Sequence, residues 1–313
     1  MERTCMDRLV GGRHAAVVAH RQTSVRQQRL VHQVIRTLAS LSPEKRRSRP
    51  HSAPPRHFES GAVGAAVATE VALDTSLGSR SSTINGTTSS SSSLGRGKSG
   101  RSSSKRRKLK VAVDVDEVLG RFLHSLNQFC REAYGMDFDV RDYHVYDFAK
   151  VWRCSQDESN HKVHEFFTSD HFAEGIECIP GSLESLQRLR QICDLMVVTS
   201  RQHVIQQPTL EWIDRHYPEV FREVHFGNHF ALEGVSKKKS DICRSIGAEV
   251  LIDDNPSYAV ECAQAGIHVL LYDWDHSYPW SKTAEGPTHD LITRVRDWQE
   301  VEEVLGVLQA TRQ

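Results

Sequence analysis

From Lys110 onward, the chain alternates between short apolar runs and longer amphipathic stretches. Five runs have the length of a strand and are almost continuously apolar, which is typical of a parallel sheet covered on both faces: 111–113, 195–198, 224–226, 250–252 and 269–271. Between them, apolar residues recur at helical spacing, for example at Leu183, Leu186 and Leu189. The alternation predicts an α/β protein with three layers and a parallel sheet.

The first two predicted strands are unusually far apart. Asp114 and Thr199 are 85 positions apart, whereas a strand–helix–strand unit needs only about 30 residues. The additional segment is rich in aromatic residues between Tyr134 and Ile179 and contains no clear strand. We therefore expect a small helical cap, at about residues 120–180, inserted after the first strand and folded over the edge of the sheet.

Residues 1–108 have a different composition from the rest. The chain has 40 basic and 40 acidic residues, but residues 1–110 hold 21 of the former and only 6 of the latter. Residues 75–104 have few large apolar side chains, so we expect 1–108 to be a disordered, basic, Ser/Arg-rich segment and 109–313 to be the folded domain. The Arg-rich residues 1–60 resemble a transit peptide for a plastid or mitochondrion. The alternative is a disordered tail, with 105–108 as a nuclear address and the protein in the cytoplasm or nucleus.

Cysteine usage and hydropathy narrow the class of protein further. The seven cysteines are odd in number and never form C-x-x-C, which favours reduced thiols in an intracellular protein. No stretch approaches the roughly 18 apolar residues of a membrane-spanning helix, so no membrane partner is expected. Binding of nucleic acid by the basic tail is a less favoured interpretation than a linker or targeting segment.

Reactive side chains follow three of the predicted strands. Carboxyl ends of parallel strands meet at one edge of a sheet, so this edge should collect Asp114, Asp116, Thr199, Ser200, Asp253 and Asp254, together with Lys239 from the helix before the fourth strand. Several carboxylates a few Å apart cannot all ionise cheaply without a cation. Mg²⁺ is typical where carboxylates meet a substrate phosphate, and hydroxyl and ammonium donors suit phosphoryl oxygens.

The order of these motifs, D-x-D, T/S, K and D-D, resembles the haloacid dehalogenase superfamily, and the second aspartate of D-x-D marks its phosphotransferase branch. The position of the cap and the stretches 180–181, 198–200 and 251–254 resemble the 5'(3')-deoxyribonucleotidase group. The resemblance covers about residues 109–272. It implies a Rossmann-like core and an Mg²⁺-dependent phosphomonoester hydrolase with an aspartyl-phosphate intermediate, most specifically a 5'-nucleotidase for (deoxy)nucleoside monophosphates.

The resemblance also implies a role for each motif residue. Asp114 would attack phosphorus, and Asp116 would protonate the leaving oxygen and then deprotonate the attacking water. Phosphoryl oxygens would be bound by Thr199, Ser200 and Lys239. Magnesium would be held by Asp114, the main-chain carbonyl of Asp116 and Asp254, with Asp253 binding it directly or supporting a direct ligand.

Two positions depart from the pattern of the family. Glu117 stands where the family usually has glycine, and Arg201 where the nucleotidases often have proline; both are expected near the substrate. They leave open a phosphatase for another small phosphate ester, such as a sugar phosphate. A different alternative is a non-enzymatic module associated with nucleic acid, in which the basic tail acts and the core is a relic.

Several aromatic and histidine residues allow more than one interpretation. The cap aromatics either stack on a base or form the core of the cap. Three aromatics after the fifth strand, Trp274, Tyr278 and Trp280, either cover the entrance of the site or pack the C-terminal segment. The cap histidines, His161, His164 and His171, have no cysteine pair to suggest zinc and are interpreted as solvated.

Overall fold

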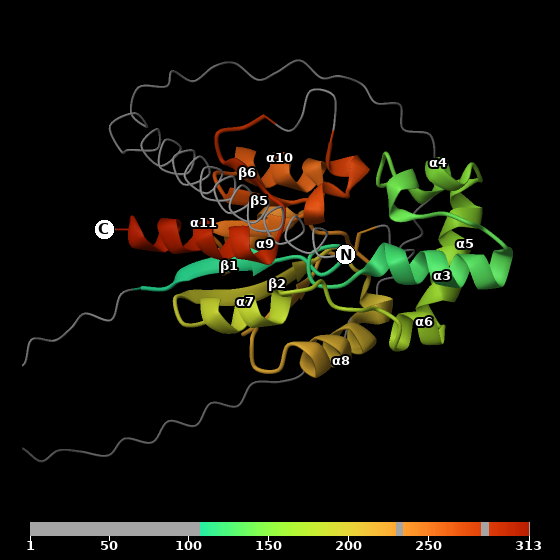
Figure 1. Cartoon of the computed structure of the whole chain (residues 1–313), viewed down its shortest axis with the longest axis horizontal. Helices are drawn as coiled ribbons and strands as arrows, with labels where there is room; N and C mark the ends of the chain where they lie inside the picture. Colours follow the sequence, from blue (N-terminus) through green and yellow to red (C-terminus); the bar gives the residue numbers. More distant parts are fainter. Residues whose placement is uncertain (1–106, 230–233, 283–287, 313) are drawn as a thin grey trace, which may run out of the picture. The chain divides into compact units, whose positions relative to one another are not determined.

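The computed structural model describes residues 107–229, 234–282 and 288–312, and Figure 1 shows the course of the chain. The expected disordered segment, with its transit peptide or nuclear address, lies outside the described residues except for Arg107 and Lys108. Six of the seven cysteines lie in the described part, all as free thiols, and Cys130, Cys193, Cys243 and Cys262 are buried. None of the helices in this part is long and apolar enough to cross a membrane.

A parallel sheet of six strands forms the centre of the domain, in the order β3-β2-β1-β4-β5-β6. The strands are β1 (Leu109–Val113), β2 (Cys193–Thr199), β3 (Val224–Phe226), β4 (Val250–Asp253), β5 (His268–Tyr272) and β6 (Ile292–Val295). All five predicted apolar runs lie in these strands. The hydropathy pattern did not indicate β6, because its sequence Ile-Thr-Arg-Val is half polar. Strands β3 and β6 form the two edges of the sheet.

Helices cover both faces of the sheet, which confirms the three layers. Alternate strand residues point to opposite faces, so Val111 and Val113 lie in one apolar cluster and Ala112 in the other. The first cluster includes residues of α7 (Ser182–Leu189), α8 (Gln206–His216) and α11 (Trp298–Ala310). The second includes residues of α9 (Lys239–Ile246) and α10 (Pro256–Gln264).

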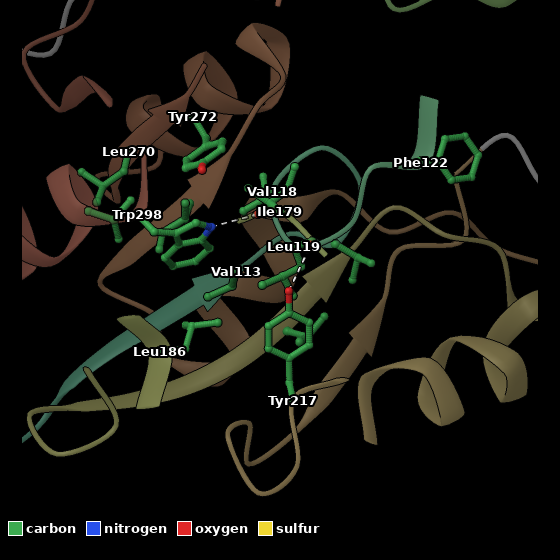
Figure 2. Close-up of a cluster of buried hydrophobic side chains, with 14 of the residues drawn as sticks. Val113, Val118, Leu119, Phe122, Ile179, Leu186, Tyr217, Leu270, Tyr272 and Trp298 are labelled. Atoms are coloured by element: carbon green, nitrogen blue, oxygen red, sulfur yellow. Dashed lines mark hydrogen bonds between the residues drawn. The ribbon is translucent and has the colours of Figure 1, made fainter. Parts of the chain in front are cut away.

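The first cluster also anchors the loop that follows β1. Figure 2 shows Trp298 of α11 and Tyr217 on either side of Val113 and Leu119, with a hydrogen bond from each ring to this loop. The Trp298 indole donates to the carbonyl of Val118 over 3.2 Å, and the Tyr217 hydroxyl donates to that of Leu119 over 2.8 Å. All four residues are buried, so these bonds fix the loop backbone against the core.

Four helices between β1 and α7 form the cap and lie together beside the sheet in Figure 1. They are α3 (Phe122–Tyr134), α4 (Phe148–Trp152), α5 (Gln156–Phe167) and α6 (Asp170–Ala173), with a 3-10 turn, η1 (Val140–Asp142). Phe166 packs edge-on against both Phe122 and Phe172, with ring centroids 5.3 and 5.4 Å away. Much of the aromatic content predicted for the cap therefore forms its core.

Candidate active site

The centre of the site is a buried ion cluster at the carboxyl ends of β1 and β4. Lys239, the first residue of α9, has no exposed surface. Its ammonium nitrogen lies 2.7 Å from Asp114 Oδ2 and 2.6 Å from Asp253 Oδ2. Burial by itself lowers the pKa of a lysine, but the two carboxylates outweigh it and raise the pKa of Lys239. The lysine is therefore a permanent cation that joins two strands of the sheet.

Three carboxylates share this cluster. Asp114, Asp253 and Asp254 each offer an oxygen within 4.8 Å of the other two. Burial, opposed by Lys239 and reinforced by Asp253 and Asp116, raises the pKa of Asp114 to about 7. Burial and the neighbouring carboxylates raise the pKa of Asp254 well above its usual range. Ionisation of all three carboxylates thus requires a further cation beside them.

The residues of the cluster fit a divalent metal. Among the described residues, Asp114 Oδ1 is a buried carboxylate oxygen with no hydrogen-bond partner. It belongs to the one group of three or more metal-ligating side chains that comes together in the described part of the chain. Carboxylate oxygens are the ligands that hard divalent cations prefer.

Asp116, the expected acid and base, is held by Arg201. Both Asp116 oxygens lie 3.2 Å from Arg201 Nε, and Oδ1 lies 2.7 Å from Nη2. The remaining guanidinium nitrogen, Nη1, donates to Thr209 over 3.0 Å, and the guanidinium carbon lies 5.3 Å from the ring centroid of Phe172. Only 3% of the Arg201 side chain is exposed, so this departure from the family pattern has become part of the site.

The second departure, Glu117, has a structural role at the start of the cap. Its backbone is left-handed, with φ of 59°, which explains why glycine suits the position. Its carboxylate accepts the N–H of Leu123 over 2.7 Å, at the start of α3, where the N-cap residue Arg121 supplies no side-chain bond. Glu117 lines a cavity of about 340 Å³ and is not among the residues that line the larger cavity beside Asp114 and Asp116. Glu117 therefore caps the first cap helix, and its expected position near the substrate stays a prediction.

A cavity of about 660 Å³ opens above the cluster. Asp114, Asp116, Ser200 and Asp254 line it from the core. Its other wall belongs to the cap and combines aromatic and polar side chains, including Tyr146, Phe148, Phe167, Gln156, Asn160 and His164. Some cap aromatics thus face the cavity while others form the cap core.

The expected phosphate-binding residues occupy different positions relative to this cavity. Ser200 lines it. Thr199 is fully buried at the end of β2, and its hydroxyl accepts the N–H of Arg201 over 3.2 Å. Lys239 lies behind Asp114 and Asp253, as a partner of both.

Two contacts in the cluster were not indicated by the motifs. The Tyr258 ring lies 4.6 Å from the Lys239 ammonium, and its hydroxyl is 2.7 Å from His229 Nδ1. No local pattern signals the contact between Tyr258 and Lys239, because Tyr258 lies in α10 and Lys239 in α9. The indole of Trp280 donates to Asp254 Oδ2 over 2.8 Å, a contact across 26 residues that no local pattern predicts.

Comparisons with known proteins agree with this picture. A family model described as 5' nucleotidase, deoxy (pyrimidine), cytosolic type C protein matches residues 107–313. No curated protein matches the chain.

Several solved structures are similar to the chain at low identity. A haloacid dehalogenase family hydrolase from Deinococcus radiodurans, with bound phosphate and sodium, has 14% identity and a TM-score of 0.47, covering 66% of this chain and 100% of its own. A haloacid dehalogenase-like hydrolase from Streptococcus pneumoniae has 14% identity and a TM-score of 0.45, covering 62% and 96%. A subfamily IA hydrolase from Geobacter sulfurreducens has 16% identity and a TM-score of 0.42, covering 64% and 97%.

Proposed function

Because the chain belongs to the 5' nucleotidase, deoxy (pyrimidine), cytosolic type C family, we propose that it is an Mg²⁺-dependent 5'-nucleotidase that releases phosphate from (deoxy)nucleoside monophosphates. Membership confirms the resemblance to the haloacid dehalogenase phosphatases that the motifs indicated, and it makes the protein a phosphatase. The substrate, the metal and the covalent mechanism are the parts of the proposal that need testing.

One observation carries the proposal: the carboxylates of Asp114, Asp116 and Asp254 line the cavity beneath the cap, and the buried ammonium of Lys239 contacts Asp114 from behind. Asp114 contributes both to the cavity surface and to the ion cluster. Lys239 neutralises part of the charge of the cluster, and the unpartnered oxygen of Asp114 remains available. This arrangement suits phosphoryl transfer, in which positioning and neutralisation of charge account for most of the catalysis.

The proposed reaction uses Asp114 as the nucleophile and Asp116 as the acid and base. A carboxylate oxygen of Asp114 attacks phosphorus, the phosphorus–oxygen ester bond breaks, and Asp116 gives a proton to the leaving oxygen. Water then attacks the aspartyl phosphate and passes its proton to Asp116, which releases inorganic phosphate and restores Asp114. Asp114, Asp254 and the carbonyl of Asp116, with help from Asp253, would hold Mg²⁺, which would supply charge neutralisation.

The cap supports a nucleotide as the substrate. Phe148, which stacks on Trp152 with ring centroids 5.1 Å apart, lines the cavity with Tyr146 and Phe167. These rings offer flat apolar surfaces, while Gln156 and Asn160 offer amide groups on the same wall. Stacking of a base on an aromatic ring is worth about 1–3 kcal/mol, and a bare sugar phosphate does not gain it.

A phosphate-release assay with Mg²⁺ tests the substrate. A nucleoside monophosphate should exceed ribose 5-phosphate in kcat/KM by roughly ten- to a hundredfold, because about 1.4 kcal/mol corresponds to tenfold. Phe148→Leu should lower kcat/KM for the nucleotide and leave that for ribose 5-phosphate nearly unchanged. Equal kcat/KM for the two wild-type reactions would favour a phosphatase for other small esters instead.

The covalent mechanism has its own test. Asp114→Asn is nearly isosteric but removes the anionic nucleophile, so it should abolish turnover of p-nitrophenyl phosphate and leave the fold intact. Retention of more than a few per cent of the wild-type kcat would exclude Asp114 as the nucleophile.

A further inference from the structure

A side chain of the segment after β5 contacts Asp254, one of the carboxylates proposed to hold the metal. The segment contains two 3-10 turns, η3 (Trp274–His276) and η4 (Pro279–Ser281). Trp280 lies in the second and is 3% exposed. Its indole N–H donates to Asp254 Oδ2 over 2.8 Å, and Asp254 is itself 3% exposed. The bond is therefore shielded from water, and in such a buried site a hydrogen bond acts more strongly on a carboxylate.

The indole ring is held on two sides. Tyr278 stacks on it with centroids 4.5 Å apart and an interplanar angle of 17°. Tyr146 of the cap meets it edge-on, with centroids 5.5 Å apart and an angle of 65°. A ring that is buried and packed in this way has little freedom to rotate, so its N–H points in one direction.

The neighbours of Trp280 belong to the same site. The Tyr278 hydroxyl donates to the carbonyl of Glu117 over 2.8 Å, in the loop that carries Asp116. Tyr146 lines the catalytic cavity. Tyr278 and Trp280 therefore do more than cover the entrance or pack the C-terminal segment. They connect the cap, the loop after β1 and Asp254.

We propose that Trp280 is a positioning residue that sets how tightly the carboxylate cluster binds its divalent metal. A hydrogen bond to one oxygen of Asp254 fixes the rotation of that carboxylate and directs its other oxygen. Groups that orient a metal ligand in this way typically change metal affinity by about 10- to 100-fold when they are removed. The inference rests on the proposed function, because it assumes that Asp254 binds Mg²⁺.

The test is a titration of the full-length protein with Mg²⁺ alone. Binding is measured as the rise in melting temperature with Mg²⁺ concentration. Trp280→Phe removes the indole N–H and keeps an aromatic ring, so the apparent Kd for Mg²⁺ should rise by about 10- to 100-fold. Trp280→Tyr, measured in parallel, should weaken Mg²⁺ binding in the same direction. The matched control is Trp274→Phe, because the Trp274 ring contacts Arg121 instead, and its Kd should equal that of the wild type.

Steady-state kinetics supply an independent readout. At low Mg²⁺ both Trp280 variants should lose activity, whereas saturating Mg²⁺ should restore most of kcat without a change in the KM for substrate. A general packing defect would instead lower kcat at every Mg²⁺ concentration, and this result, or an apparent Kd within twofold of the wild type, would overturn the proposal.

Asp254→Asn separates this proposal from the proposed function. If Asp254→Asn abolishes the Mg²⁺-dependent shift and Trp280→Phe leaves it unchanged, only the role of Trp280 is refuted. If Asp254→Asn itself binds Mg²⁺ like the wild type, the metal site of the proposed function is wrong, and the inference about Trp280 fails with it.

Discussion

Replacement of Lys239 by methionine should destabilise the protein strongly while keeping the volume of the side chain. The substitution removes the ammonium that contacts Asp114 and Asp253, at 2.7 and 2.6 Å, and leaves both carboxylates buried. Removing one partner of a buried ion pair costs about 3–5 kcal/mol, because the remaining charge has no compensation. For a domain of this size about 1 kcal/mol corresponds to about 2–4 °C, so the melting temperature should fall by roughly 10 °C.

The size of the effect should depend on pH. A carboxyl group whose pKa is raised in the folded protein takes up a proton as the pH falls, and the pKa of Asp114 is already about 7. Protonation removes the unpaired charge, so the penalty of Lys239→Met should be largest at pH 8 and smaller at pH 5.5. Thermal unfolding in EDTA, monitored by circular dichroism at the two pH values, measures the fall in melting temperature and its dependence on pH.

The matched control for this prediction is Lys238→Met. Lys238 precedes the same helix but is exposed, so its replacement should change the free energy of unfolding by less than about 0.5 kcal/mol. Activity should follow the same order, with a loss of at least about a hundredfold in kcat for Lys239→Met alone. A melting temperature of Lys239→Met within 2 °C of the Lys238→Met value, or a larger loss for Lys238→Met, would refute the assignment of Lys239.

Four further results are expected. In EDTA the Asp114 carboxyl stabilises the fold at acid pH, and this contribution is lost as the pH rises from about 4 through about 7. The melting temperature should therefore fall over that window, and Mg²⁺ should raise the melting temperature more at pH 8 than at pH 5. A melting temperature that rises with pH in EDTA would contradict this. Arg201→Lys should lower kcat at least about tenfold, because an ammonium cannot hold both Asp116 oxygens and Thr209 together; wild-type kcat would disprove it. Glu117→Gly should be about 1 kcal/mol more stable than Glu117→Ala, since both lose the cap on α3 but only glycine relieves the left-handed backbone; the reverse order in chemical denaturation would be inconsistent with that account. Deletion of residues 1–104 should leave the melting temperature and kcat/KM unchanged, because every catalytic motif lies after them; aggregation or lost activity would place part of this segment in the folded unit.

Local sequence patterns were sufficient for most of the fold. Nearly continuous apolar runs predicted β1, β2, β4 and β5, since a strand buried on both faces has few polar positions to interrupt it. The edge strand β3, Val-His-Phe, was predicted from its two apolar residues although it is only partly buried. The length of chain between Asp114 and Thr199 predicted the inserted cap. The same patterns did not indicate β6, because Thr293 and Arg294 interrupt its apolar residues.

The chemistry of the site divides in the same way. Motifs at the ends of strands identified Asp114, Lys239, Asp253 and Asp254, because parallel strands deliver their carboxyl ends to one edge whatever their side chains. The tertiary structure alone decided what those side chains contact: Arg201 meets Asp116 across 85 residues, and Trp280 meets Asp254 across 26. It also decided that Glu117 caps α3. Such contacts depend on backbone angles and side-chain packing between distant segments, and neither has a period along the chain.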